Sequence, residues 1–312
     1  MAHKLFSRLA SAAGIVCILL FAGLAPLGAY AESDYQRGSS ATPSVSVGPQ
    51  YDTTHVYVSN EDIDAFVNSF VATFDGKASQ RAVFCVTPTP SKTASQYVQS
   101  PVGMISVFAF QTPIPHPFGL ERHGYLVTDI DKAVKAAKAS GADVLVDTFD
   151  DPIGKDAVIQ WPGGVNMQLY WHTKAPVYAP LQAVPDNRVY VSKEAASKFV
   201  RSFVRFSHGK VVSDNRKADA GEIGRPGETV RRIRIQSGFG KMVVFATNGK
   251  LPYPFGYETT GYQVKDLAAT LEKAQSNGVK TLSQPYQADT GKSAIVEFPG
   301  GYIAEIHDSE AK

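Results

Sequence analysis

An internal repeat constrains the fold of this chain more than any other feature. The sequence VYVS at residues 56–59 recurs at 189–192, an offset of 133 residues. Further along, the Pro-Gly-Gly of 162–164 recurs at 299–301, and the offset has grown by four to 137. Self-similarity over such a distance indicates duplicated domains, with one short loop insertion in the second copy. We expect two homologous domains at 52–174 and 186–308, joined by a Pro-rich, semi-rigid linker at 175–185.

The first 31 residues have the pattern of an export signal. Lys4 and Arg8 precede an uncharged apolar run, which ends in the small-x-small sequence Ala-Tyr-Ala at 29–31. A basic start, an apolar middle and a small-residue cleavage site are typical of secretory signal peptides. We therefore expect a signal peptide at 1–31, a flexible leader at 32–51, and a periplasmic or secreted protein. An uncleaved anchor is the alternative, because the run is long enough to span a bilayer.

Composition argues against several classes of protein. Cleavage of the signal would leave 29 basic and 29 acidic residues, and this balance gives no support for a nucleic-acid partner. No stable membrane span would remain after cleavage. Cys85 would be the sole cysteine, which excludes an intramolecular disulfide, and its apolar run at 82–86 predicts a buried thiol. The sequence has no nucleotide-binding loop, nucleophile elbow, CxxC or HExxH motif.

Hydrophobic periodicity in the first domain alternates between strand and helix patterns. Helices are predicted at 62–74 and at 131–140, the second ended by Gly141. Strands are predicted at 55–59, 81–87, 104–110, 122–127, 143–146, 157–161 and 165–171. Each half-domain therefore consists of one strand, then a helix, and then further strands.

This order resembles the vicinal-oxygen-chelate superfamily, which contains glyoxalase I, extradiol dioxygenases and bleomycin-resistance proteins. Segments 124–131 and 261–267, each running into a helix that ends at a glycine, are similar to the opening of the family's second module. The Pro-Gly-Gly turns with their following strands, at 162–171 and 299–307, are similar to its closing strand. The resemblance covers nearly all of the chain after the signal. It implies an α+β fold, a tandem repeat of two domains, each with two βαβββ modules that form a curved cup with helices outside.

The resemblance also implies where a metal ion would be held, because ligands in metal-dependent members come from the first and last strands of both modules. In the first domain, these positions fall on Thr53, Arg122 and Gln168. His123 is a ligand only if the strand register slips by one residue, since alternation turns His123 toward the helices and Arg122 into the cup. The alternative for His123 is a partly buried histidine bonded to backbone.

In the second domain, the corresponding positions fall on Asp186, Thr259 and Glu305. His307 shares a strand face with Glu305, close enough for both side chains to bind one ion. The alternative is that Glu305 pairs with a lysine at the cup rim and that His307 frays with the C-terminus. A divalent metal is the one cofactor that the sequence suggests, and neither domain has a complete set of ligands.

Other candidates come from residues that both domains keep. Glu121 and Glu258 follow the Pro-Phe-Gly turns, where each is a candidate general base or, alternatively, an acceptor for turn N–H groups. Lys155 and Lys292 are candidates for the cup mouth, with solvated loop lysines as the alternative. Residues 231–234 read as an exposed strand edge. An apolar cup wall is expected from aromatic residues: Tyr170, Trp171, Phe108, Trp161 and Tyr302.

Three functions compete on these grounds. The first is an exported glyoxalase-like protein that binds a small molecule in a cup, with no complete catalytic metal site. The second is a metal-dependent lyase, isomerase or dioxygenase that uses one cup. The third is an exported interaction module in which both cups have degenerated. The sequence leaves open whether the chain is an enzyme, which ligand it takes and its oligomeric state.

Overall fold

The computed structural model describes residues 44–115, 117–119, 122–173, 181, 183–254, 256–289 and 291–308. The signal peptide and most of the leader and linker predicted from the sequence lie outside these residues. The described part of the chain packs as one compact unit. It contains two curled mixed sheets and four α-helices, and none of these helices is both long and apolar enough to span a bilayer.

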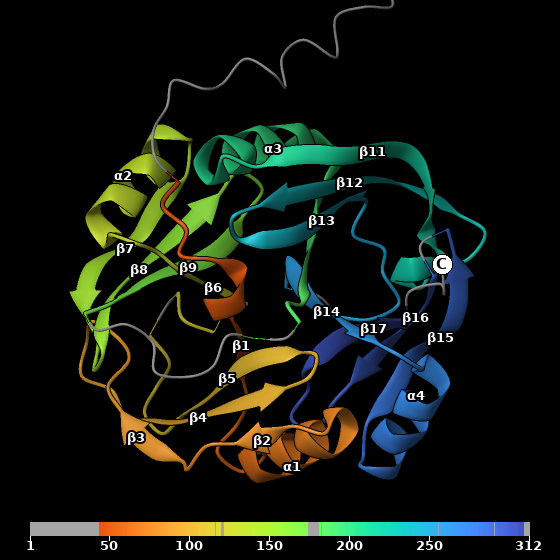
Figure 1. The fold of residues 1–312 in the computed structure, drawn as a ribbon, viewed down its shortest axis with the longest axis horizontal. Helices are drawn as coiled ribbons and strands as arrows, with labels where there is room; N and C mark the ends of the chain where they lie inside the picture. Colours follow the sequence, from red (N-terminus) through yellow and green to blue (C-terminus); the bar gives the residue numbers. More distant parts are fainter. Residues whose placement is uncertain are drawn as a thin grey trace, which may run out of the picture. The chain divides into compact units, whose positions relative to one another are not determined.

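The first sheet joins two modules side by side (Figure 1). Its strands are β1 (Thr53–Tyr57), β2 (Lys77–Ala78), β3 (Ala82–Phe84), β4 (Thr93–Ser100), β5 (Gly103–Phe110), β6 (His123–Leu126), β7 (Asp143–Asp150), β8 (Gly154–Trp161) and β9 (Val165–His172). Their order is β2-β4-β5-β1-β6-β9-β8-β7, with β3 paired to β4. β1 runs parallel to β5 and antiparallel to β6, which runs parallel to β9. The β1–β6 contact is therefore the seam between the modules.

The second sheet repeats this arrangement. Its strands are β10 (Asp186–Ser192), β11 (Lys210–Asp219), β12 (Thr229–Ser237), β13 (Gly240–Thr247), β14 (Glu258–Val264), β15 (Lys280–Ala288), β16 (Gly291–Glu297) and β17 (Ile303–Asp308). Their order is β11-β12-β13-β10-β14-β17-β16-β15, and β10 takes the place of β1. The predicted fold class, with two cups built from βαβββ modules, is confirmed.

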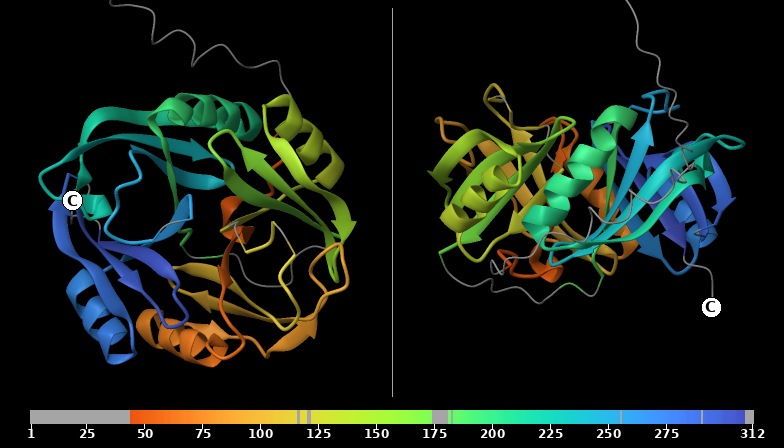
Figure 2. Two further views of the ribbon diagram at one scale, coloured as in Figure 1. Left: turned by 180° about the vertical axis from the view of Figure 1, so that it is seen from behind. Right: turned by 90° about the horizontal axis from the view of Figure 1, so that it is seen from above.

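Three of the four α-helices begin at a capping side chain. The helices are α1 (Ile63–Phe74), α2 (Ile130–Ala139), α3 (Lys193–Ser207) and α4 (Leu267–Ser276), with short 3-10 turns η1 (Pro49–Tyr51) and η2 (Ala220–Ile223). Asp129, Ser192 and Asp266 each accept a hydrogen bond from the backbone N–H three residues later. Gly141 then follows the end of α2 with φ +96°, a left-handed conformation that glycine adopts without strain. All four helices lie on the outer faces of the sheets (Figure 2).

The two repeats share their hydrophobic cores. α1 of the first repeat packs beside α4 of the second (Figure 1). A single cluster of buried residues combines Phe66 and Phe70 of α1 with Tyr262 of β14 and with Phe298, and the rings of Phe70 and Tyr262 are 5.5 Å apart. On the other side, Trp161 of β8 packs against α3. Each module therefore buries its helix against a module of the other repeat.

Candidate functional site

Strand alternation decides which side chains enter each cup. Val56 belongs to the cluster beneath α1, so its neighbours Thr53, His55 and Tyr57 face the opposite, concave side of the first sheet. By the same alternation, Arg188 and Tyr190 line the second cup. At the repeat offset, Arg188 stands at the position of His55.

Aromatic rings form the wall of the first cup. The ring of Tyr57 stacks on that of Phe108 at 5.5 Å and on that of Phe110 at 6.2 Å. The guanidinium of Arg122 lies over the Tyr57 ring, 5.8 Å from its centre, and its Nη1 donates a hydrogen bond to the carbonyl of Gly119 at 3.0 Å. All four of these side chains are only partly buried, so the wall remains accessible.

The floor of the first cup is polar. Thr53 Oγ1 and Ser106 Oγ lie 3.0 Å apart. A Cβ on Gly124 would be 2.6 Å from His55 Nε2, so glycine at this position allows the imidazole to lie directly on the strand. Gln168 is paired with Gly124 in the β6–β9 register, and its amide makes no hydrogen bond with any residue that the structure describes. The floor thus offers neutral donors and acceptors.

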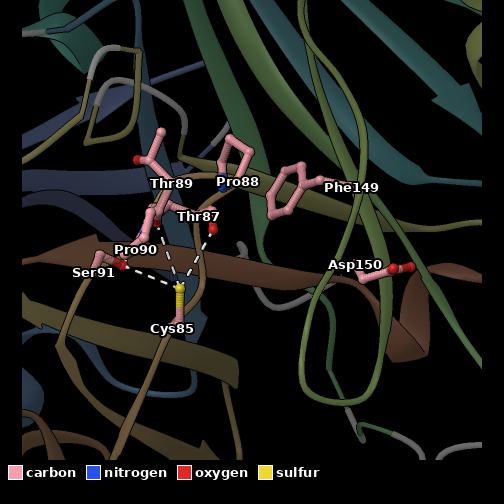
Figure 3. A pocket seen from close by; sticks show the side chains of 8 residues that line it. All are labelled: Cys85, Thr87, Pro88, Thr89, Pro90, Ser91, Phe149 and Asp150. Carbon is pink, nitrogen blue, oxygen red and sulfur yellow. Dashed lines mark hydrogen bonds between the residues drawn. The ribbon is translucent and has the colours of Figure 1, made fainter.

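The mouth of the first cup holds a pocket of about 510 Å³ (Figure 3). The loop from Cys85 to Ser91, at one edge of the sheet, forms one side, and Phe149 and Asp150 of β7, at the opposite edge, form the other. Phe149 lies opposite Asp156, which lies opposite Tyr170, so Phe149 is on the concave face. The pocket therefore opens where the two edges of the sheet approach each other.

Cys85 lines this pocket, and its predicted burial is wrong. The strand ends at Phe84, and the chain then turns away through Pro88 and Pro90, which leaves the thiol exposed. The Cys85 Sγ donates to the carbonyls of Thr87 and Thr89, each at 3.5 Å. Hydrogen bonds with the backbone of Ser91 and Thr87 lower the pKa of Cys85.

The second cup is closed at the place that corresponds to this pocket. Tyr286 stands at the position of Phe149 in the repeat, and η2 packs directly on its ring. A Cβ on Gly221 of η2 would be 2.0 Å from the ring carbon Cε1 of Tyr286, whose hydroxyl donates to Asp219 Oδ2 at 2.9 Å. The space between η2 and β15 is thus occupied by protein, and the second repeat has a pocket of about 440 Å³ elsewhere, between Tyr190–Glu194, Thr247–Gly249 and Tyr257.

Charged side chains fill the interior of the second cup. Arg188 is 3% exposed, and its Nη1 lies 3.6 Å from Glu305 Oε1. The Arg188 Nη2 donates to the carbonyl of Glu222 at 3.0 Å, and the guanidinium lies 4.8 Å from the centre of the Phe245 ring. Burial alone would lower the pKa of Arg188, but Glu305, together with Tyr190, Glu222 and Tyr253, outweighs it and raises that pKa.

Glu305 lies between two basic side chains, Arg188 and His307. Its Oε2 lies 2.8 Å from His307 Nδ1, and its other oxygen faces Arg188. Burial would raise the pKa of Glu305, but Arg188 and His307 together lower it. Burial would likewise lower the pKa of His307, and Glu305 raises it. The structure therefore places Glu305 and His307 on one face, as alternation predicts, and joins them directly.

The residues at the family's metal positions do not fit a divalent ion. In the second cup, Glu305 already balances Arg188, and Thr259 Oγ1 shares a hydrogen bond of 3.1 Å with Tyr190 Oη. In the first cup, Arg122 places a positive charge at a ligand position, beside neutral Thr53 and Gln168. Among the described residues, no three His, Cys, Asp or Glu side chains are grouped as metal ligands would be. A second cation next to a buried guanidinium would be strongly repelled.

Two other residues that the sequence suggested as site residues, Glu258 and His123, lie between the cups. Glu258 is buried and accepts hydrogen bonds from Asn187 Nδ2 at 2.9 Å and from the backbone N–H of Arg122 at 3.2 Å. His123 Nδ1 is 3.7 Å from Glu258. Burial, with a smaller contribution from His55, lowers the pKa of His123 to about 3, so at neutral pH this contact is not an ion pair. The third such candidate, Glu121, is outside the described residues.

The two candidate lysines are not in the cups. Lys155 shares its strand face with Ala157 and Ile159, and Lys292 shares its face with Ala294. These are the outer faces, so both lysines point away from the concave side. Trp161 and Tyr302 also pack on the helix side, whereas Phe108 and Tyr170 line the first cup.

Sequence reasoning missed the arginines of the second cup. The interpretation of residues 231–234 as an exposed edge is wrong, because β12 lies between β11 and β13. Arg232 is 4% exposed and binds both carboxylate oxygens of Asp289 at 2.8 Å, and it also pairs with Glu222. The signal was present in the alternation, since Ile233 and Ile235 face the helices and thus turn Arg232 and Arg234 inward.

Comparison with known proteins agrees with this architecture. The sequence matches no protein-family model and no curated protein sequence. Among solved structures, a triple mutant of 4-hydroxymandelate synthase from Streptomyces coelicolor is 11% identical, with a TM-score of 0.54 over 86% of this chain and 94% of its own. The 2,3-dioxygenase LapB from Pseudomonas sp. KL28 is 12% identical, with a TM-score of 0.53 over 86% and 94%.

A third similar structure is a fusion of a xylose isomerase-like TIM barrel with a 4-hydroxyphenylpyruvate dioxygenase. It is 12% identical, with a TM-score of 0.51 over 87% of this chain and 50% of the fusion. At such identities the likeness is one of fold and not of chemistry. These neighbours and the shared strand order show that the chain has the vicinal-oxygen-chelate fold.

Proposed function

We propose that this protein is an exported small-molecule-binding protein that takes its ligand into the first cup and needs no metal ion to hold it. The observation that carries the proposal is the difference between the two repeats at the edges where each sheet curls toward itself. The first has a pocket of about 510 Å³ between the Cys85–Ser91 loop and Phe149. In the second, Tyr286 and Gly221 are in direct contact.

The lining of the first cup supports this function. A volume of about 510 Å³ lies within the range of small-molecule sites. That pocket is lined by the Cys85–Ser91 loop, Phe149 and Asp150. Elsewhere in the same cup, the partly exposed rings of Tyr57, Phe108 and Phe110 supply apolar surface, and Gln168 supplies polar groups that can fix a ligand's orientation.

The competing function, a metal-dependent lyase, isomerase or dioxygenase, has less support. Arg122 in one cup and Arg188 beside Glu305 in the other put positive charge where such an enzyme needs donors for a cation. Export is supported by the signal pattern that ends at residues 29–31. N-terminal sequencing of protein recovered outside the cytoplasm tests it, with Glu32 as the expected first residue and Met1 as the contrary result.

The neutral fluorescent probe N-phenyl-1-naphthylamine tests binding in the first cup. We expect fluorescence enhancement that saturates with one probe per chain. Thr89→Trp places a large ring in the mouth at an exposed position, and it should weaken probe binding by about tenfold or more, because it fills the pocket. Val212→Trp is the matched control at an exposed site on β11. If both variants bind the probe as the wild type does, the ligand site is not in this cup.

A further inference from the structure

We propose that the outer surface of α2 and α3 docks on an anionic lipid bilayer. Such docking goes beyond the binding of a small molecule in the first cup and is independent of it. The four helices lie in two pairs, α2 beside α3 and α1 beside α4 (Figure 1). With their capping residues, α2 and α3 carry seven lysines and arginines and three acidic residues, whereas α1 and α4 carry one lysine and five acidic residues. The two pairs therefore have opposite net charge.

Five exposed basic side chains form one patch on α2 and α3, which we call the basic face. They are Lys135, Lys138, Lys198, Arg201 and Arg205. The three on α3 follow the i, i+3, i+7 spacing of one helix face, and the two on α2 are three residues apart. A Cβ on Gly141, just after α2, would be 3.2 Å from Ser202 Oγ. The end of α2 therefore lies against the second half of α3, and the two rows of basic residues belong to one surface.

The charge of the basic face is not neutralised within the protein. Among the residues that the structure describes, none of its five side chains makes an ion pair. On the other pair of helices, by contrast, the single lysine, Lys273, bonds to Asp75 at 2.8 Å. Asp131 and Glu194 are in the first turns of α2 and α3, where the helix dipole stabilises negative charge. The positive field of the basic face thus favours an anionic partner.

The composition of the basic face favours a lipid surface over a protein partner. Among the described residues, no large apolar side chain is exposed on α2 or α3. A protein–protein interface normally has an apolar core, which this face does not supply. An anionic bilayer requires none, because each lysine or arginine near its surface is attracted by the headgroups without insertion. We therefore expect peripheral binding that is electrostatic.

The chain also enters the fold beside the basic face. Ser46 forms a β-bridge with Val127, just before α2. Ser46 also lies against the turn between β12 and β13, where Phe239 stacks on Phe206 of the last turn of α3 at 5.5 Å. The preceding sequence is thus connected to the fold between α2 and α3. It includes the uncharged run of residues 9–31, whose pattern is typical of a segment that is directed to a membrane.

Co-sedimentation with lipid vesicles tests this docking. The chain that begins at Glu32 is used, because it keeps every described residue and lacks the apolar run, which would itself enter a bilayer. We expect it to bind vesicles of equal parts phosphatidylglycerol and phosphatidylcholine at about 0.15 M salt, and not vesicles of phosphatidylcholine alone. Binding should be lost at about 1 M salt, where the screening length falls to about 3 Å. Inorganic phosphate at the concentration of the lipid headgroups should not release the protein, since one phosphate cannot contact both helices.

Two double variants locate the surface. Lys138→Gln with Lys198→Gln removes one charge from each helix of the basic face, and it should weaken binding to the anionic vesicles by about tenfold or more. Lys77→Gln with Lys265→Gln is the matched control, because it removes the same charge from exposed sites beside α1 and α4. The control should change binding by less than about twofold, since its lysines are screened from the bilayer. Both variants should unfold at the urea concentration of the wild type, because all four lysines are exposed.

Each contrary result is distinct. Equal binding to the two kinds of vesicle, or equal effects of the two double variants, would overturn the docking. Tighter binding to a short DNA duplex than to vesicles at the same phosphate concentration would also overturn it, because the partner would then be a nucleic acid. A dimer that Lys138→Gln with Lys198→Gln dissociates would assign the basic face to a second copy instead. None of these results affects the proposed function, which the binding of N-phenyl-1-naphthylamine tests separately.

Discussion

The ring of Tyr286 occupies the place that a side chain at Gly221 would need, with only 2.0 Å between an added Cβ and the ring carbon Cε1. Gly221 belongs to η2, at one edge of the second sheet, and Tyr286 belongs to β15 at the other. The contact is therefore the point at which the second cup closes on itself. The first repeat has Phe149 in place of Tyr286 and a pocket in place of the contact.

Gly221→Ala should destabilise the protein by about 1–3 kcal/mol, because a methyl group forced into a packed contact displaces its neighbours. The measurement is the free energy of unfolding in urea. Gly256→Ala is the matched control, since a Cβ there meets no atom within 4 Å and its φ is not positive, so a change within about 0.5 kcal/mol is expected. Equal stabilities for the two variants would mean that η2 does not press on Tyr286.

Arg188→Met should cost about 3–5 kcal/mol of unfolding free energy, because it leaves the buried Glu305 carboxylate without its guanidinium partner. Adding Glu305→Gln removes that stranded charge, so the double variant should be more stable than the sum of the single changes predicts. The exposed pair Lys280–Glu297, at 3.0 Å, is the control, and Lys280→Met should cost at most about 1 kcal/mol. Additive effects of Arg188→Met and Glu305→Gln would show that the two groups do not interact.

Acid should destabilise the protein through His123. The folded pKa of His123 is about 3 and its unfolded value about 6.5, so the unfolded chain binds an extra proton between these values. The stabilisation is complete above about pH 6.5 and is lost as the pH falls toward 3, with a slope of up to about 1.4 kcal/mol per pH unit. Urea unfolding at about pH 7 and about pH 4.5 should show a smaller difference for His123→Gln than for the wild type.

His307→Gln tests whether a histidine with a raised pKa gives the opposite pH dependence of stability. The folded pKa of His307 is raised, so its contribution is present at low pH and is lost as the pH rises through that folded value. His307→Gln should therefore reduce stability more at about pH 4.5 than at about pH 7, opposite to the change expected for His123. Identical pH profiles for the two variants would contradict the assignment of both histidines.

The Cys85 thiol should react with 5,5′-dithiobis(2-nitrobenzoate) in the folded protein without denaturant, because it is exposed and its pKa is lowered. A bulky maleimide on Cys85 should then block N-phenyl-1-naphthylamine, since the thiol lines the mouth of the first cup. Cys85→Ser, treated in the same way, should keep its probe binding. A folded protein whose Cys85 reacts only in denaturant would place the thiol inside the fold.

The fold could be predicted because its signals are periodic and are repeated. Strand alternation and the offsets of 133 and 137 residues needed no knowledge of long-range contacts. Alternation also gave the orientation of Arg122 toward the cup and of His123 away from it. The candidate site was harder to predict from the sequence than the fold, because the closure of a cup depends on how far the two edges of its sheet curl toward each other. Nothing local to Gly221 or Tyr286 in the sequence reveals that they meet.

The burial of charge was also hidden from sequence reasoning. An arginine in a strand is commonly solvated, so although alternation turns Arg232 inward, nothing in the sequence predicted that Arg188 and Arg232 would be only 3% and 4% exposed. Their burial depends on partners from distant segments, Glu305 for the first and Asp289 for the second. Cys85 was mispredicted in the opposite direction, as buried: its apolar neighbours suggested an interior strand, but β3 lies off the main strand order, and its residues Val83 and Phe84 are 52% and 42% exposed.

The cluster that joins Phe66 and Phe70 to Tyr262 and Phe298 has a consequence for the way this chain can be divided. A cut between residues 174 and 185 separates the repeats in sequence but leaves half of that cluster on each fragment. Each fragment alone would expose a large aromatic surface and aggregate, whereas the two fragments produced together should associate and restore the fold. The two halves thus depend on each other for their packing. A destabilising change in either half is expected to lower the melting temperature of the whole protein in one cooperative step.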